Sequence, residues 1–115
     1  MAPQLEVPNM DSLAAMEVEV VAGEEPWVTT VRAVADDGLI AEITWDQVAA
    51  SVAFTLFRAD QVLVRIERES MVIVRVFSSK VGVHFDAELA SGDLGGTLTV
   101  DIGPTVVVRD YLLRQ

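Results

Sequence analysis

The sequence predicts an all-β or mainly β fold: an antiparallel meander of about eight or nine short strands, closed as a small barrel or folded as a two-sheet sandwich. Apolar and polar residues alternate through most of the chain, which is the period of a strand with one buried face. β-branched residues dominate the apolar runs and suit a pleated surface. The breaks between runs are short, and no helix of crossover length alternates with them, which disfavours a parallel α/β sheet.

The clearest alternation lies in residues 52–86, where short polar breaks separate four apolar runs. A helix over these residues would place Arg65 and Glu69 on the same stripe as Val62 and Ile66 and would bury charge. As strands, the four runs present one uniformly apolar face. The predicted core face consists of Val52, Phe54, Leu56, Val62, Val64, Ile66, Val72, Val74, Val76, Val81, Val83 and Phe85.

The same pattern constrains the turns, because a slip of one residue moves a whole strand onto the wrong face. We expect three-residue loops at 58–60 and 68–70 and a two-residue turn at 79–80, so that the four runs form three consecutive hairpins. The predicted cross-strand pairs are Leu56 with Val62, Ile66 with Val72, and Val76 with Val83.

The N-terminal third begins with 12 residues that contain two prolines and no periodicity. We therefore expect a flexible N-terminal arm at 1–12, followed by a single β domain at 13–115. Turn residues cluster at 23–26 and at 36–38, where Asp-Asp-Gly is the strongest short turn signal of the chain. The strands separated by these turns are expected at 13–22, 27–35 and 39–45.

Residues 46–52 leave two alternatives open. Asp46 is a residue type that caps helices, and alanines follow it, so one short helix near 46–52 is the first alternative. The second is a short turn into a strand at 52–57. We favour the strand, because every second residue from 52 to 56 is apolar and another strand follows.

A short helix is also an alternative at 87–91, ahead of a glycine-rich segment that we expect to be mainly a flexible loop. That segment has no Lys-Ser/Thr after it and matches no phosphate-binding motif. The last two strands are expected at 97–102 and 105–113. A loop at 103–105 would place Ile102 opposite Val106.

Composition excludes several classes of protein. The net charge of −10 repels nucleic acids and anionic membranes, whereas it allows a basic protein partner. No apolar run approaches 18 residues, so no transmembrane helix is expected. The absence of cysteine excludes disulfides, thiolate metal sites and cysteine nucleophiles, and it agrees with a cytoplasmic location.

The sheet face opposite the predicted core mixes charged residues with large apolar ones. A monomer of this size should not expose a large contiguous apolar patch, so we expect another sheet or another subunit to cover this face. The candidate binding residues on it are Leu63, Arg65, Ile73, Arg75, Phe77, His84 and Asp86.

Catalytic and metal chemistry find little support in the sequence. His84 is the only histidine, and without cysteine or a second histidine it does not complete a zinc site. Ser78 or Ser79 with His84 and Asp86 would supply the residue types of a hydrolase triad, but no G-x-S-x-G elbow accompanies them. We therefore expect no metal and no cofactor, and we disfavour an enzyme.

Three functions remain. The first is a non-catalytic domain that self-associates, as a homodimer or higher oligomer, or binds a protein partner through the candidate sheet face. The second is an immunity- or antitoxin-like protein that neutralises a basic protein. The third is a small-molecule-binding β-barrel or minor enzyme that uses His84, Arg75 and Asp86.

Overall fold

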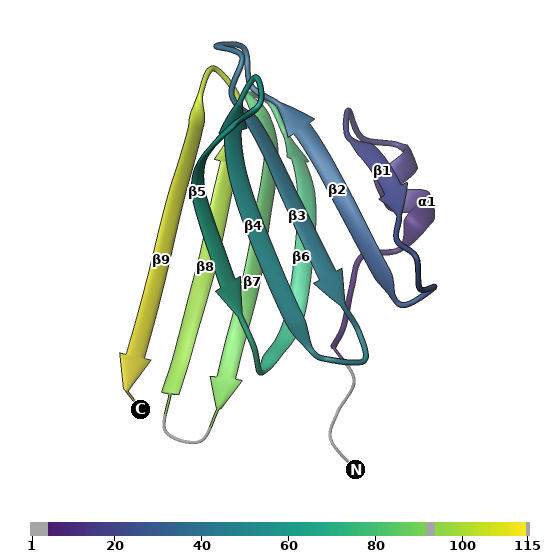
Figure 1. The fold of residues 1–115 in the computed structure, drawn as a ribbon, viewed down its shortest axis with the longest axis vertical. Coiled ribbons are helices and arrows are strands. Elements are labelled where there is room, and N and C mark those ends of the chain that lie inside the picture. The colour runs from purple at the N-terminus through teal and green to yellow at the C-terminus, as the bar shows by residue number, and fades with distance from the viewer. Residues whose placement is uncertain (1–4, 92–93, 115) are drawn as a thin grey trace.

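The computed structural model describes residues 5–91 and 94–114 and shows a two-layer β-sandwich (Figure 1). All pairings between neighbouring strands are antiparallel, in a five-stranded sheet of order β1-β2-β3-β4-β5 and a four-stranded sheet of order β6-β7-β8-β9. The prediction of an all-β meander is confirmed, and of its two closures the structure has the sandwich, not the barrel.

The elements follow one another with short connections. They are α1 (Met10–Ala14), β1 (Glu19–Ala22), β2 (Val28–Val34), β3 (Ile40–Asp46), β4 (Ser51–Arg58), β5 (Gln61–Arg68), β6 (Met71–Ser79), β7 (Gly82–Ser91), β8 (Leu94–Ile102) and β9 (Val106–Arg114).

The core is the apolar layer between the two sheets. Trp45 and Phe54 from the five-stranded sheet and Phe85 from the four-stranded sheet are its largest side chains, each at most 1% exposed. Within the described residues no polar or charged residue is buried. Each large apolar side chain placed here contributes roughly 1.5–3 kcal/mol by leaving water.

The predicted register holds in one hairpin and slips by two residues in two others. Ile102 lies opposite Val106, as predicted. Val76 lies opposite Phe85 instead of Val83, because the turn is Lys80–Val81 and not 79–80. Leu56 lies opposite Val64 instead of Val62, with an irregularity next to Phe57. A slip of two residues leaves side chains on their predicted faces, which is why the apolar pattern did not reveal it. The exception is at the irregularity, where Val62 lies opposite Phe57.

The predicted hairpin between residues 61–69 and 71–77 is wrong. β5 is the last strand of one sheet and β6 is the first strand of the other, so Ile66 does not pair with Val72. Glu69 and Ser70 carry the chain across the sandwich, and Ser70 has a φ of 58° in the left-handed region.

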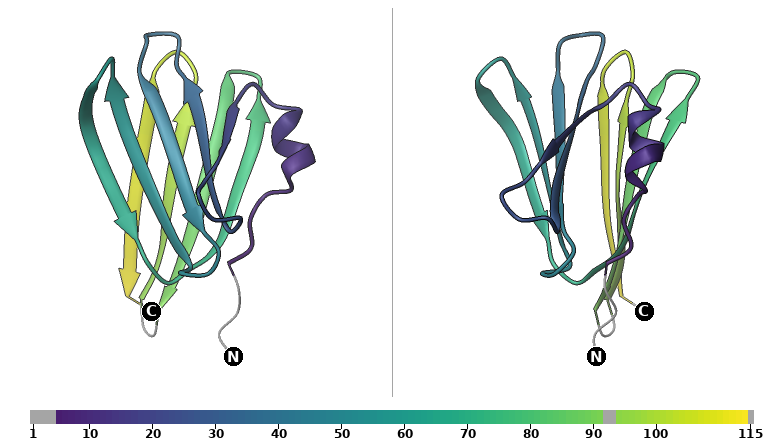
Figure 2. Two further views of the ribbon diagram at one scale, coloured as in Figure 1. Left: turned by 45° about the vertical axis from the view of Figure 1, so that its right-hand side comes forward. Right: turned by 90° about the vertical axis from the view of Figure 1, so that its right-hand side faces the viewer.

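Three members of the predicted core face are exposed. Val62 is 60%, Val64 40% and Val81 74% exposed. At one end of the sandwich the corners that hold the β4–β5 and β6–β7 turns diverge (Figure 2), and these three valines lie at or near those corners. Val74, on the same predicted face, is 3% exposed.

Neither alternative helix forms. Residues 47–50 make a turn in which the Asp46 carboxylate accepts hydrogen bonds from the N–H groups of Val48 and Ala49, and β4 then begins at Ser51. Asp46 therefore caps a turn. β7 continues to Ser91, which excludes a helix at 87–91 and shortens the expected loop; residues 92–93 of that loop lie outside the described residues.

The N-terminal segment joins the two sheets. Glu6 makes a parallel bridge to Ile73 on the edge of β6, and its N–H donates to the Val72 carbonyl at 3.1 Å. Leu5 and Leu13 are buried, and α1 lies along this side of the sandwich (Figure 2). Residues 10–14 thus form a helix where we expected the end of an arm and the start of a strand. The flexibility of 1–12 stays a prediction.

Two turns from different sheets are hydrogen-bonded at one end of the molecule. The N–H groups of Asp36 and Asp37 donate to the carbonyls of Gly103 and Pro104 at 2.8 and 3.0 Å. Hydrogen bonds from the Thr105 hydroxyl and the Leu39 N–H lower the pKa of Asp37 from its usual value. The ionised Asp37 therefore belongs to the contact between the sheets.

Asp37→Asn is expected to lower stability at neutral pH and to have less effect in acid. A carboxyl whose pKa is depressed by folding stabilises the fold above its unfolded-state pKa, and this contribution is lost as pH falls through the folded-state pKa. Urea unfolding at about pH 7 and about pH 3 measures the difference in midpoint from the wild type. Asp60→Asn, in the exposed β4–β5 turn, is the control and should change either midpoint little. An Asp37→Asn difference that is equal at both pH values would contradict the expectation.

Candidate functional site

The structure divides the predicted binding patch between two sheets. Leu63 and Arg65 lie on β5 of the five-stranded sheet, where Arg65 contacts Thr55 and Glu67. The other members lie on the four-stranded sheet, where they share one region of its outer face. These are Ile73, Arg75 and Phe77 on β6 and His84 and Asp86 on β7.

The charged residues of this outer face form a continuous network. Asp86 accepts from Arg75 Nη1 at 3.0 Å and lies 3.3 Å from His84 Nε2. Asp101 on β8 lies 2.6 Å from His84 Nδ1 and accepts from Arg109 Nη1 at 3.3 Å. The observed register creates these contacts, because it places Arg75 opposite Asp86 and His84 opposite Asp101.

This network neutralises most of its own charge. Hydrogen bonds and charge interactions with Asp86 and then Glu88 raise the pKa of Arg75 above its usual value. Phe77 stacks on the His84 ring with centroids 6.1 Å apart. His84 therefore lies on an outer sheet face, so the hypothesis of a barrel interior that holds His84, Arg75 and Asp86 is wrong.

Sequence reasoning missed where the excess negative charge is concentrated. The first 31 residues contain six acidic residues and neither lysine nor arginine; the first basic residue is Arg32. Counting charge along the chain would have revealed this asymmetry. The structure places residues 5–31, which contain all six of these acidic residues, along the side of the sandwich formed by β1 and β2 and the edge of β6.

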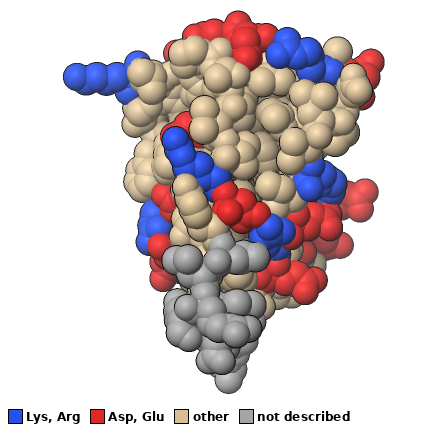
Figure 3. Space-filling model, turned by 90° about the vertical axis from the view of Figure 1, so that its left-hand side faces the viewer, with Lys and Arg blue, Asp and Glu red and all other residues tan. Residues whose placement is uncertain are grey.

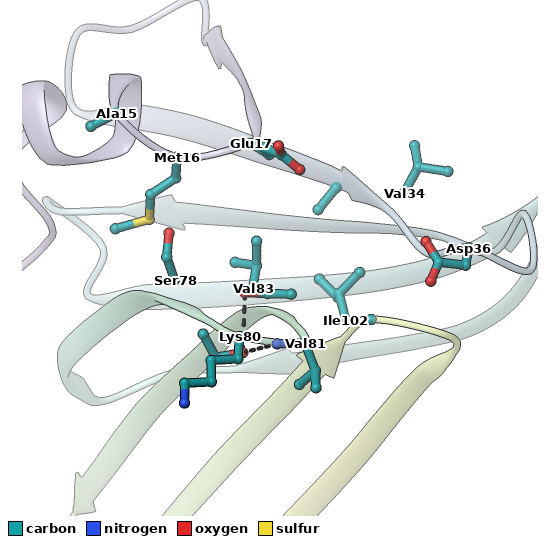
Figure 4. Close-up of a pocket in the computed structure, with 14 residues that line it drawn as sticks. Ala15, Met16, Glu17, Val34, Asp36, Ser78, Lys80, Val81, Val83 and Ile102 are labelled. Atoms are coloured by element: carbon teal, nitrogen blue, oxygen red, sulfur yellow. Dashed lines mark hydrogen bonds between the residues drawn. The ribbon is translucent and has the colours of Figure 1, made fainter.

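A groove opens at the end of this acidic side (Figure 4). It has a volume of about 460 Å³ and lies between the segment after α1, the end of β2 and the β6–β7 turn. Glu17 and Asp36 line it together with exposed Val34 and Val81. Ser78 and Ser79, which the sequence offered only as members of a triad with His84, line this groove, whereas Glu17 and Asp36 were not predicted as site residues, because the lining comes from turns far apart in the chain.

The opposite side of the sandwich is apolar and has two strand edges. β5 and β9 each have a neighbour on one side only, and the Arg68–Asp110 ion pair joins them. Figure 3 shows a broad uncharged area over the upper half of this side. The large apolar residues exposed on these two strands are Val62, Leu63, Val64, Val107 and Tyr111.

Among residues 5–91 and 94–114, no group of three or more histidine or acidic side chains is arranged to hold a metal. Within the same ranges, the structure contains no helix with the length and apolar character needed to cross a membrane.

These features define the class of protein: an acidic nine-stranded antiparallel β-sandwich with one acidic side and one apolar side. No family model matches the chain, and no curated protein matches it in sequence. Among solved structures, it is similar to a chain of the contact-dependent growth inhibition toxin–immunity protein complex from Klebsiella pneumoniae 342. The TM-score is 0.77 at 15% identity, over 95% of this chain and 97% of the other, which shows a shared fold.

Asp86→Ala is expected to lower the free energy of unfolding by about 1 kcal/mol, because its carboxylate is mostly buried and contacts both Arg75 and His84. Glu88→Ala is the matched control: its side chain is 45% exposed and reaches Arg75 only at 3.5 Å. We expect the control to lose less than about 0.5 kcal/mol in urea unfolding. Equal losses would show that the network is not centred on Asp86.

Proposed function

We propose that this protein is a non-catalytic binding protein that neutralises a basic protein partner. The observation that carries the proposal is the excess of carboxylates over basic residues, since most arginines already hold a carboxylate of their own chain. The paired arginines are Arg32, Arg65, Arg68, Arg75 and Arg109. The acidic residues without a basic neighbour, which are most frequent in the first 31 residues, can attract a positively charged partner.

The structural comparison supports a toxin as the partner. The similar chain belongs to a complex of a toxin and an immunity protein, and the likeness covers nearly the full length of both chains. A strongly acidic member of this fold suits the immunity side of such a pair when the toxin is basic. Neutralisation by binding also needs no catalytic residue.

Growth rescue tests this proposal. A cell that makes a toxic protein must also make its neutraliser, so the candidates are the products of the genes that flank this one. We expect a basic flanking product to stop growth of a bacterial host when it is expressed alone and to permit growth when it is expressed with this chain. The purified pair should bind at least about tenfold more weakly when the salt concentration is raised from about 50 to about 500 mM.

The proposal fails if no flanking product both inhibits growth and binds this chain at micromolar concentration. Binding that does not change with salt would contradict the basic character of the partner.

A second candidate function is self-association through the apolar side. Edge strands offer unpaired N–H and C=O groups, and two copies related by a twofold axis can pair one edge antiparallel with itself. Val62, on the β5 edge, is 60% exposed and would be covered by such a contact.

Val62→Lys is expected to convert a dimer to a monomer, because a lysine on an edge strand opposes pairing with a second chain. Light scattering at concentrations up to about 1 mM, a range in which weak dimers form, measures the mass. Val48→Lys, which changes a 70% exposed valine in the β3–β4 turn, is the control and should leave the dimer intact. A wild-type protein that is a monomer throughout would exclude this candidate.

A further inference from the structure

The groove beside α1 combines a concave shape with exposed apolar side chains. Val34 is 62% and Val81 74% exposed. Met16 follows α1 in the chain and lines the side of the groove next to that helix (Figure 4). Its volume of about 460 Å³ is twice the 220 Å³ of the groove near Trp45, to which a single acidic residue, Glu25, contributes.

The carboxylates of this groove are free of internal cations. Glu17 and Asp36 form no ion pair within the part of the chain that the structure describes, in contrast to Asp86 and Asp101 on the outer face of the four-stranded sheet. Lys80 lies across the groove, and its side chain extends away from both carboxylates (Figure 4). A positively charged partner is therefore attracted more strongly to the unpaired carboxylates of the groove than to the ion pairs on the outer face of the four-stranded sheet.

One wall of the groove consists of two turns in close backbone contact. A Cβ atom at Gly82 would lie 1.8 Å from the Ile102 carbonyl oxygen, and one at Gly103 would lie 2.5 Å from the Val81 carbonyl oxygen. Only glycine permits this approach, so the β6–β7 and β8–β9 turns are locked together. A wall built in this way needs little ordering when a ligand binds.

We infer that this groove is the docking site for a lysine or arginine side chain of the basic protein partner, an inference that rests on the proposed function. The aliphatic part of such a side chain would lie on Val34 and Val81, and its cation would face Glu17 and Asp36. Long basic side chains bury their stems on apolar surface while their charged ends keep polar contacts. A charged hydrogen bond to a carboxylate is also stronger than a neutral one.

The first experiment uses N-acetyl-arginine amide as the probe and follows the amide signals of the ¹⁵N-labelled protein by NMR. We expect millimolar binding with shifts confined to the groove, and none with N-acetyl-citrulline amide, which has a similar shape without the charge. Glu17→Gln with Asp36→Asn should weaken probe binding about tenfold. Asp60→Asn with Glu69→Gln removes the same charge elsewhere and should leave binding unchanged.

Shifts that are spread over all acidic regions, or an equal loss in both double variants, would overturn the inference. A second arm measures the affinity of both variants for the partner identified by growth rescue. If the Glu17→Gln/Asp36→Asn protein binds that partner as tightly as the control, the groove is not its docking site, although neutralisation stands. If no flanking product is neutralised, the proposed function fails, while the NMR result still decides whether the groove binds a cationic side chain.

Discussion

The structure depends on the apolar layer enclosed between the two sheets. Each sheet contributes one face to this layer, so apolar and polar side chains must alternate along each strand. Charged side chains are excluded from the layer. Charges then collect on the outer faces and at the rims, where those of the four-stranded sheet pair with one another. At one end of the sandwich the corners that hold the β4–β5 and β6–β7 turns diverge (Figure 2), and the groove beside α1 lies next to the β6–β7 turn.

The period of two predicted the strands and their inward faces, since it follows directly from burial on one side. It could not predict absolute register, because a slip of two residues preserves the face of Val76 and Leu56 alike. The period of two also could not distinguish two strands that are hydrogen-bonded in one sheet from two strands that face each other in opposite sheets. Ile66 and Val72 alternate in the same way whether their strands are neighbours in one sheet or belong to opposite sheets, and the latter is what the chain does.

The sequence predicted only part of the candidate site, because it predicted some strand pairs correctly and one wrongly. Arg75, His84 and Asp86 come together because their strands do pair, whereas Leu63 and Arg65 were assigned to that face through a hairpin that does not exist. The acidic segment before Arg32 is visible in the sequence as a charge asymmetry. The groove is not, because Gly82 and Gly103 must first bring two separate turns into contact.

The sandwich is also divided along the chain, since all strands before Glu69 form one layer and all strands after Ser70 form the other. Within each layer every strand pairs with its neighbour in sequence, and the contacts between distant parts of the chain arise where the two layers pack together. The two layers are joined by a link of only two residues, Glu69 and Ser70. Two molecules whose links straighten can exchange entire layers, and each composite sandwich would then bury the same apolar surface as the original.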